Sequence, residues 1–455
     1  MGNSIATSDA MEWIEERGIR TIRVEGTNLD GAYIGKVVSP AKFQSGLTSG
    51  FALADVAFGL DMGATPYYGF AWPDWRGDLA DIYLRPDTST LIEWSPGRAS
   101  VIGDFWGESK PISVCPRNAL RRIYEGVKDL GFTSKVAIEV EATVFQESIY
   151  EARLKGYRDL TPLGGTSGSA YNLTKSKDWE EYLFAVSDRL DELGIVWEAW
   201  NDESAVGQVE INIAPGDPIT VADNWARTRQ VMREVANDQG RVVTFMAKWS
   251  DEWGQASHIN ISLEKDGVNA FYDPEGPSQD MLHFLGGLMA TIEGTTSFAM
   301  PWITSFRRMG EFQGPPTTTT WGINNKSTAI RAMVKHPKYS RLEYRVPGSD
   351  ANIYLVLAAV LGTGLAGIAG QMTPPPPYTT MAWGDPGKIG RLPNTITKAI
   401  EALKADSILS NVMGSEMIDY WAGTRTWEWW NYHNAGGNPE SFVTQWESDR
   451  YFELS

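Results

Sequence analysis

The sequence is poor in cysteine and histidine and contains no long apolar run. Its 455 residues include one cysteine, Cys115, and four histidines. A single cysteine excludes an internal disulfide framework and is typical of a reducing cytoplasm. The most apolar segment, Tyr354 to Ala369, is short for a membrane span and predicts a buried helix. Met1 to Arg20 carries acids and no apolar run, so we expect no signal peptide.

Positive charge is also scarce. Forty Lys and Arg residues against 57 Asp and Glu residues give a formal net charge of −17, which argues against nucleic acid or an anionic membrane as the main partner. A phosphate-binding loop is missing too, because no stretch reads G-x-x-x-x-G-K-[ST]. Any phosphate must therefore be held by side chains from elsewhere in the chain.

The length and the pattern of segments predict two domains. Short alternating runs between Arg20 and Val101, such as residues 20–25 and 89–93, predict a small β-rich domain over residues 1–106. Residues 107–455 mix helical periodicity with strands that carry polar motifs. We expect helices over residues 116–130, 179–193, 223–238, 281–293 and 351–365, and another from Asn394, its cap, to Leu403.

Polar residues recur at alternating positions in five short segments of this second part. Because a strand has a period of two, residues two apart share one face. Two carboxylates on one face repel each other unless a cation or a proton lies between them. The segments carry Glu139 and Glu141; Glu203 and Glu210 around Gly207; His258, Asn260 and Ser262; Lys326 and Arg331; and Arg341, Glu343 and Arg345.

Each motif alone also fits a solvated strand face or a structural histidine. The apolar neighbours of Glu139 and Glu141 favour a site instead. Carboxylates with one imidazole suit Mg²⁺ or Mn²⁺, and guanidinium groups bind phosphate and carboxylate in a bidentate manner. The set as a whole predicts an enzyme that uses ATP and divalent metal ions.

In order and spacing these motifs resemble the glutamine synthetase family, from about Arg23 to the C-terminal helices. Glu139 and Glu141 match its Glu-x-Glu pair, and Glu203 to Glu210 match its Glu-x-x-x-Gly-Gln-x-Glu segment. Residues 244–248, Thr-Phe-Met-Ala-Lys, match its Thr-Phe-Met-Pro-Lys stretch. The resemblance implies an α+β fold: a small β-grasp domain, then a catalytic domain with a curved antiparallel sheet flanked by helices.

The resemblance also implies roles for single residues. One metal ion would be held by Glu141, Glu203 and Glu210, and a second by Glu139, His258 and Glu343, with two or three Mg²⁺ or Mn²⁺ ions per site. Glutamate would contact Gly254, Arg308 and Arg345. ATP would contact Asn260, Ser262 and Arg341, while Arg331, Arg341 and Lys326 would act on the phosphates. The family's active sites lie between subunits of stacked rings, usually a dodecamer.

The departures from the family point to a different nucleophile. Glutamine synthetases carry a flap glutamate that binds ammonium and takes its proton, but an ungapped count places Gly314 there, and a small gap would bring in Glu311 instead. The ammonium loop of the first domain is not recognisable, and Asp61 is its nearest candidate. Asn260 and Lys326 replace a histidine and an arginine of the family. Trp302 and Phe306 would enlarge the pocket for the nucleophile.

A larger, less acidic pocket fits an organic amine better than ammonium. The expected reaction joins the γ-carboxylate of L-glutamate to an arylamine such as aniline, or to an alkylamine, as in γ-glutamylamide synthetases that open amine catabolism. The γ-carboxylate would attack the terminal phosphate of ATP while Arg341 compensates charge. The amine would then attack γ-glutamyl phosphate, and Arg331 and Lys326 would stabilise the departing phosphate.

Other interpretations stay open. The chain could be an ordinary glutamine synthetase that uses ammonia, or an enzyme that γ-glutamylates polyamines. Outside catalysis, it could be a structural pseudoenzyme on the same fold, against which all six predicted metal ligands argue. A Ca²⁺-binding module would not account for the arginines.

Overall fold

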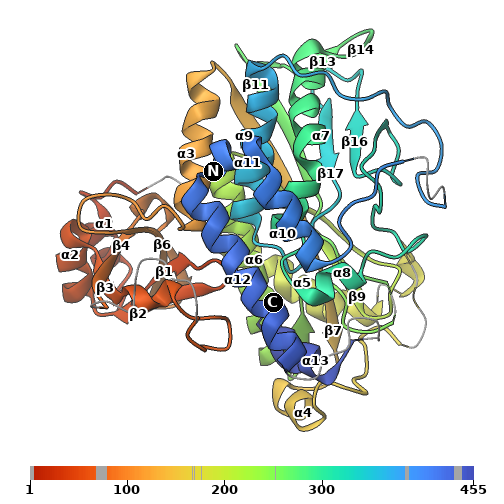
Figure 1. The fold of residues 1–455 in the computed structure, drawn as a ribbon. Helices are drawn as coiled ribbons and strands as arrows, with labels where there is room; N and C mark the ends of the chain where they lie inside the picture. Colours follow the sequence, from red (N-terminus) through yellow and green to blue (C-terminus); the bar gives the residue numbers. More distant parts are fainter. Residues whose placement is uncertain are drawn as a thin grey trace.

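The computed structural model describes residues 5–67, 79–165, 168, 170–175, 177–251, 253–384, 389–434 and 443–454. Within them lie two large sheets and a set of helices, most of which belong to the second half of the chain (Figure 1). The expected α+β architecture is confirmed. In the part of the chain that is described, no helix combines the length and apolar character needed to cross a bilayer.

The N-terminal part folds around a six-stranded sheet. Its strand order is β2-β1-β6-β4-β3, with β5 beside β6, and β1 runs parallel to β6. The expected strand at residues 89–93 is partly wrong, because a short 3-10 helix, Thr88–Thr90, precedes β5. The elements are α1 (Ala10–Glu16), β1 (Thr21–Thr27), β2 (Tyr33–Val38), α2 (Pro40–Ser49), β3 (Phe51–Ala54), β4 (Asp81–Pro86), β5 (Ile92–Ser95) and β6 (Arg98–Trp106).

The larger sheet carries the polar motifs. It has nine strands in the order β15-β16-β17-β11-β7-β9-β8, with β10 (Val242–Thr244) beside β7 and β12 (Val268–Asn269) beside β11. All its pairs are antiparallel except β15 with β16. The principal strands are β7 (Thr133–Phe145), β8 (Trp197–Asp202), β9 (Gln208–Gly216), β11 (Ile259–Lys265), β15 (Trp321–Ile323), β16 (Ile330–Met333) and β17 (Arg341–Tyr344).

The helices of the second part occur where the periodicity predicts them, with shifted ends. Asp217 caps α6 and Pro218 opens it, so this helix begins five residues before the predicted Asp223. Thr395, not Asn394, caps α10, because the Thr395 hydroxyl accepts from Lys398 N. The bounds are α3 (Pro116–Asp129), α4 (Ile149–Leu154), α5 (Lys177–Glu192), α6 (Pro218–Asp238), α7 (Gln279–Ala299), α8 (Ile303–Arg307), α9 (Ile353–Ala369), α10 (Ile396–Ala405), α11 (Ser407–Met413), α12 (Ser415–Asn434) and α13 (Gln445–Tyr451).

The apolar segment Tyr354 to Ala369 forms α9, which lies buried in the centre of the molecule (Figure 1). It packs closely on α7 through small residues. A Cβ atom added at Gly287 would collide with the carbonyl oxygen of Thr363, and one added at Gly367 with that of His283. The prediction of a buried helix is therefore confirmed, and the glycines set how closely the two helices approach.

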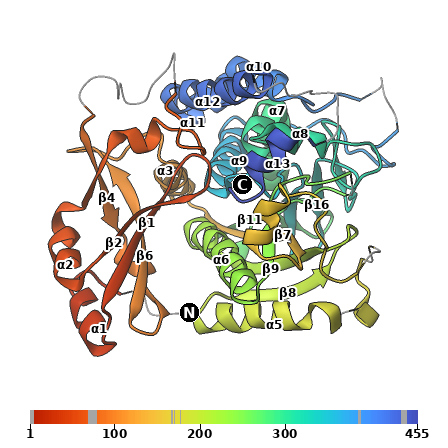
Figure 2. The same ribbon diagram turned by 90° about the horizontal axis from the view of Figure 1, so that it is seen from below.

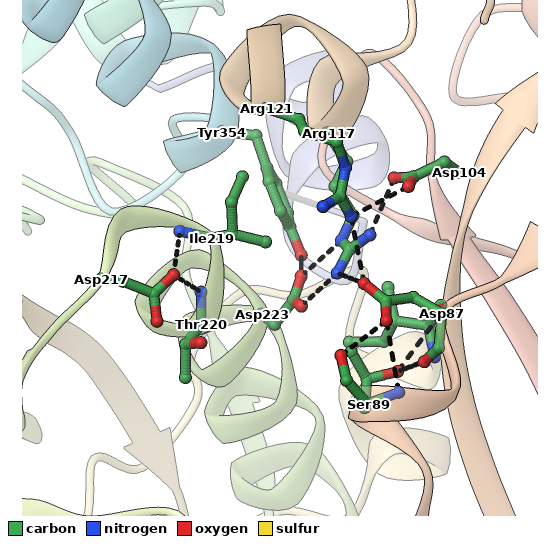
Figure 3. Close-up of polar contacts among 12 residues, drawn as sticks. Asp87, Ser89, Asp104, Arg117, Arg121, Asp217, Ile219, Thr220, Asp223 and Tyr354 are labelled. Atoms are coloured by element: carbon green, nitrogen blue, oxygen red, sulfur yellow. Dashed lines mark hydrogen bonds and ion pairs between the residues drawn. The ribbon is translucent and has the colours of Figure 1, made fainter. Parts of the chain in front are cut away.

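The N-terminal sheet is tied to the helices of the second part by a buried cluster of charges around Arg117 of α3 (Figure 3). Its guanidinium group pairs with Asp104 of β6 at 2.8 Å, with Asp223 of α6 at 2.8 Å and with Asp87 at 3.0 Å. Tyr354 of α9 donates to Asp223 at 2.6 Å. Five segments are thus joined where the smaller sheet stands beside the helices in Figure 2. The domain boundary at residue 106 stays a prediction; β6 ends at Trp106.

Candidate active site

Strand β7 carries the two acids of the first motif. Val136, Ile138 and Val140 alternate with Glu139 and Glu141, and the valines and the isoleucine are buried in the main core. This alternation turns both acids to the opposite face of the sheet. Glu141 is 5% exposed and accepts hydrogen bonds of 2.7 Å from Gln208 Nε2 and from Ala256 N.

The turn between β8 and β9 brings the second pair of acids beside β7. Gly207 has a φ of +82°, and a Cβ atom there would lie 2.7 Å from Cβ of Pro162, so the turn requires glycine. Glu210 stands opposite Glu141 in the β7–β9 register. The prediction that Gly207 lets Glu203 and Glu210 converge agrees with this geometry.

His258 stands directly before β11, whose neighbours are β7 and β17. Its Nδ1 lies 2.6 Å from Oε2 of Glu139 and 3.9 Å from Oε1 of Glu343. Glu343 comes from β17 and also pairs with Arg331 and Arg345. Three adjacent strands therefore place one imidazole and two carboxylates together.

The six predicted metal ligands fall into the two predicted groups. Glu139, His258 and Glu343 each offer a ligand atom, and these atoms lie within 4.8 Å of one another. The same holds for a second group of three acids. Carboxylate oxygens with one imidazole nitrogen are the donor set that Mg²⁺ and Mn²⁺ accept. The second group is Glu141, Glu203 and Glu210.

Both groups line a single cavity of about 220 Å³, here called the acid cavity. Arginines and a lysine form another part of its wall, so anions and cations face each other across a small space. Gln208, the carbonyl side of Gly254 and a short loop at Gln313 complete the enclosure. The basic residues on the wall are Arg308, Lys326, Arg331 and Arg345.

Burial and crowding shift the acids of this cavity toward their protonated forms. Burial, and then the charge of Glu343, raise the pKa of Glu139 to about 7. Burial, with Glu139 and Glu203 nearby, raises the pKa of Glu210 to about 8. The pKa values of Glu141 and Glu203 are raised as well, mainly by burial. So many carboxylates become fully ionised together only if cations compensate them.

The pKa values of two other residues in the cavity, His258 and Glu343, are lowered. Burial, and then Arg345, hold the pKa of His258 well below its usual value, so the imidazole is neutral and able to bind a metal ion. Burial alone would raise the pKa of Glu343, but the charges of Arg345 and Arg331 outweigh it and lower that pKa. Glu343 is therefore ionised, between two guanidinium groups.

Twelve of the predicted site residues line the acid cavity, and six do not. Arg341 donates from Nε to Oδ1 of Asn260 at 2.9 Å, and Asn260 borders the cavity only through a 3.4 Å contact with Glu139. Ser262 lies farther along β11. The residues inside are the six metal ligands with Gly254, Arg308, Gly314, Lys326, Arg331 and Arg345.

Of the four residues predicted to line the pocket for the nucleophile, only Gly314 lies at the acid cavity. Gly314 lines the acid cavity, but Trp302 is buried under Arg425 and Tyr451 and reaches no part of the wall. Phe306 lines a neighbouring cavity instead. Asp61 pairs with Arg450 at 2.9 Å and accepts from Trp427 Nε1, so within this chain it stays away from the acids.

Glu311, the alternative to Gly314, points away from the acid cavity. Its carboxylate pairs with Arg391, accepts from Oγ1 of Thr317 at 3.0 Å and accepts from Gly384 N at 2.9 Å. The loop therefore presents no carboxylate to the acids. The ring of Trp253 lies beside Gly314 instead, 3.5 Å from the position that a Cβ atom on Gly314 would take.

Sequence reasoning missed part of the wall. Gln208, Tyr171 and Gln313 line the cavity, and no motif assigned them a role. Gln208 lies inside the segment that carries Glu203 and Glu210, and its position two residues before Glu210 was the available signal. Tyr171 and Gln313 come from loops that carry no periodic pattern.

Comparisons with known proteins agree with this arrangement. A family model described as the catalytic domain of glutamine synthetase matches residues 113–451. A glutamate–isopropylamine ligase of Pseudomonas sp. is 30% identical over 453 residues, 97% of both chains. A gamma-glutamylethanolamide synthetase of Streptomyces coelicolor is 29% identical over 389 residues, 85% of this chain and 82% of the relative. A solved structure of a GmaS/ADP complex has a TM-score of 0.82 at 25% identity, covering 96% of this chain and 98% of its own.

Proposed function

Because the chain belongs to the glutamine synthetase family, we propose that it joins the γ-carboxylate of L-glutamate to an organic primary amine. It is an ATP-dependent carbon–nitrogen ligase. One observation carries the choice of an amine over ammonia: the loop at Gly314 presents no carboxylate to the acid cavity, and Glu311 is held by Arg391. The isopropylamine and ethanolamide named for the two relatives support an amine.

The two groups of ligands would hold Mg²⁺ or Mn²⁺, two or three ions per site. One buried atom supports the presence of a bound ion or its water here. Oε1 of Gln208 has no hydrogen-bond partner among the described residues, although the same amide group bonds to Glu141. The neutral imidazole of His258 is in the form that binds metal. Bound divalent ions would neutralise phosphate charge during phosphoryl transfer.

The basic wall would hold the anionic ends of the substrates. Nε of Arg345 is buried without a partner among the described residues, so it can donate to the α-carboxylate of glutamate. Arg308 has less freedom, because its two Nη atoms donate to the carbonyl oxygens of Val346 and Arg345. Lys326 and Arg331 stand on the same wall and would stabilise the phosphate as it leaves.

The residues predicted to bind ATP form a line beside this wall. Arg341 and Asn260 bond to each other, and Asn260 reaches Glu139, so these side chains extend from the acid cavity along β11 and β17. ATP would lie along this line with its terminal phosphate toward Lys326 and Arg331. Ser262 is the outermost member of this line.

The same loop also bears on which class of amine the enzyme would accept. An arylamine is largely neutral at pH 7 and needs no strong base, so the missing acid favours it. The names of the relatives favour alkylamines instead. A polyamine would need further acids at the entrance, and the Gln313–Pro315 segment of the wall supplies none.

Two further predictions belong to this proposal. The enzyme would assemble into stacked rings, usually dodecamers in this family, with active sites between neighbouring subunits; light scattering should then give about twelve times 50.4 kDa. The second prediction is a cytoplasmic location, which the single cysteine of the chain supports.

The test is ATP-dependent phosphate release with purified protein, glutamate and Mg²⁺ or Mn²⁺. Ammonia, ethanolamine, isopropylamine, putrescine and aniline are compared at equal concentrations, and mass spectrometry identifies the product. A γ-glutamylamide of at least one alkylamine or arylamine should form at a higher kcat/KM than glutamine. Ammonia as the best substrate at millimolar levels would make the chain an ordinary glutamine synthetase.

A further inference from the structure

A second cavity of about 370 Å³ adjoins the acid cavity, here called the side cavity. Gln313 lines both of them. Gln313 therefore stands between the two spaces, in the loop where the family's acid is missing. Nothing in the reaction with ammonia requires a space of this size next to the nucleophile.

Much of the side cavity's wall is apolar. Phe306 is the penultimate residue of α8, Met309 follows that helix, and Trp429 comes from α12. Ile303 and Ile396 add aliphatic surface from α8 and α10. Helices α8, α10 and α12 thus supply an apolar lining, which is typical of a cavity that receives an organic group.

Three polar side chains of the wall, those of Lys248, Gln313 and Arg307, contact other protein groups, and Asp251 adds one carboxylate to the lining. Nζ of Lys248, a residue 7% exposed, lies 3.3 Å from Oε1 of Gln313. The side chain of Gln313 also folds over Gly310, where a Cβ atom would meet its Oε1 at 2.4 Å. Arg307 forms an ion pair with Glu447 of α13. Lys248 and Gly310 therefore fix Gln313 at the junction of the two cavities.

We propose that the side cavity receives the apolar substituent of the amine, with Gln313 beside the reacting nitrogen. This inference rests on the proposed function and specifies its substrate class: amines with a branched alkyl or aromatic group. The nitrogen points past Gln313 and Gly314 into the acid cavity, while the substituent lies against Phe306, Met309 and Trp429. Size then selects the substrate, since a methylene group in such a pocket is worth about 10-fold or more in kcat/KM.

Two substitutions test the inference from opposite directions. Met309→Trp should fill the side cavity, and Trp429→Ala should remove one wall. Both should lower kcat/KM for isopropylamine and aniline at least 10-fold, mainly through KM, and should change that for methylamine less than threefold. Phe312→Trp is the matched control, because Phe312 is in the same loop but faces Trp383 at a centroid distance of 6.0 Å.

The outcomes separate this inference from the proposed function. Suppose that the wild type uses both methylamine and isopropylamine. If each variant then changes kcat/KM for the two amines by the same factor, or changes neither value, the side cavity is not the site of the substituent, and the chain is still an amine ligase. If the wild type uses ammonia alone, both proposals fail. Thermal melting of each variant shows that it folds, and a crystal structure with a γ-glutamylanilide product would locate the ring directly.

Discussion

Gln208 donates a 2.7 Å hydrogen bond from Nε2 to Oε2 of Glu141, and both residues lie buried in the acid cavity. The bond fixes the carboxylate whose other contact is the backbone N–H of Ala256. The remaining amide oxygen of Gln208 has no partner among the described residues. Gln208 therefore holds Glu141, a predicted metal ligand, in position.

We therefore expect Gln208→Ala to weaken Mg²⁺ or Mn²⁺ binding about 10- to 100-fold, as loss of an outer-shell partner does. Isothermal titration of the metal-free protein measures the change. Gln230→Ala is the matched control, because Gln230 donates to Glu234 at 2.7 Å on α6, outside the acid cavity. Equal affinities in all three proteins would show that Glu141 does not depend on Gln208.

A carboxylate added to the flap should favour ammonia. Gly314→Glu places an acid beside Trp253 at the edge of the acid cavity, where it can bind ammonium and accept a proton. We expect the ratio of kcat/KM for ammonia to that for isopropylamine to rise at least 10-fold. Competition between the two amines, read by mass spectrometry, measures it.

The backbone of Gly314 complicates this substitution, so it needs a control. Its φ is +89°, and a side chain there costs about 1–2 kcal/mol. Gly314→Ala carries the same strain without the acid and should leave the substrate ratio unchanged. If Gly314→Ala shifts the ratio as much as Gly314→Glu does, strain in the loop, not the carboxylate, selects the substrate.

Metal affinity should depend steeply on pH between 6 and 8. Burial raises the pKa of Glu139 to about 7 and that of Glu210 to about 8, so protons compete with metal ions for both groups. As the pH rises, the Kd for Mg²⁺ should fall by up to 10-fold per pH unit for each proton that metal binding releases. Titrations in buffers of different ionisation enthalpy count the protons, and a Kd that is constant over this range would contradict the prediction.

The same shifts act on the stability of the metal-free protein. A carboxyl whose folded pKa is raised stabilises the fold below its unfolded value near 4.5, and this contribution is lost as the pH rises through about 7 to 8. The melting temperature without metal should therefore fall between pH 5 and 8, and saturating Mg²⁺ should restore most of it at pH 8. EDTA should return the lower value.

The structure brings the predicted metal ligands together in the two predicted groups because their signal in the sequence is local, and their binding of metal ions stays a prediction. Period two in β7 and β17 places each acid on a definite face, and the order of the motifs supplies the partners across strands. Gly207 could be read from its position between two acids, since only a turn brings Glu203 and Glu210 together.

The pocket for the nucleophile could not be predicted in this way. Trp302 and Phe306 are four residues apart in one short stretch, yet Trp302 packs under Arg425 and Phe306 opens onto the side cavity. Which way a ring points in a five-residue helix depends on α12 and α13, which come more than 100 residues later. Asp61 likewise finds Arg450, a partner 389 residues away.

The buried charges around Arg117 predict a large loss of stability when the arginine is removed. Arg117→Met leaves Asp87, Asp104 and Asp223 without their shared cation, which should cost about 3–5 kcal/mol and lower the melting temperature at fixed protein concentration. Arg121→Met is the control: Arg121 also pairs with Asp87 and Asp104, but its side chain is 38% exposed, so it should cost at most about 1 kcal/mol.

Acid titration tests the same cluster independently. Burial alone would raise the pKa of Asp87, but Arg117, Ser89 and Arg121 outweigh it and lower the pKa to about 2. A depressed carboxyl pKa stabilises the fold above the unfolded value near 3.8, and this contribution is lost as the pH falls toward 2. Arg117→Met should therefore move the acid-unfolding midpoint, followed by circular dichroism, to a higher pH than the wild type and than Arg121→Met. Identical midpoints for the two variants would mean that the buried guanidinium contributes no more than its exposed neighbour.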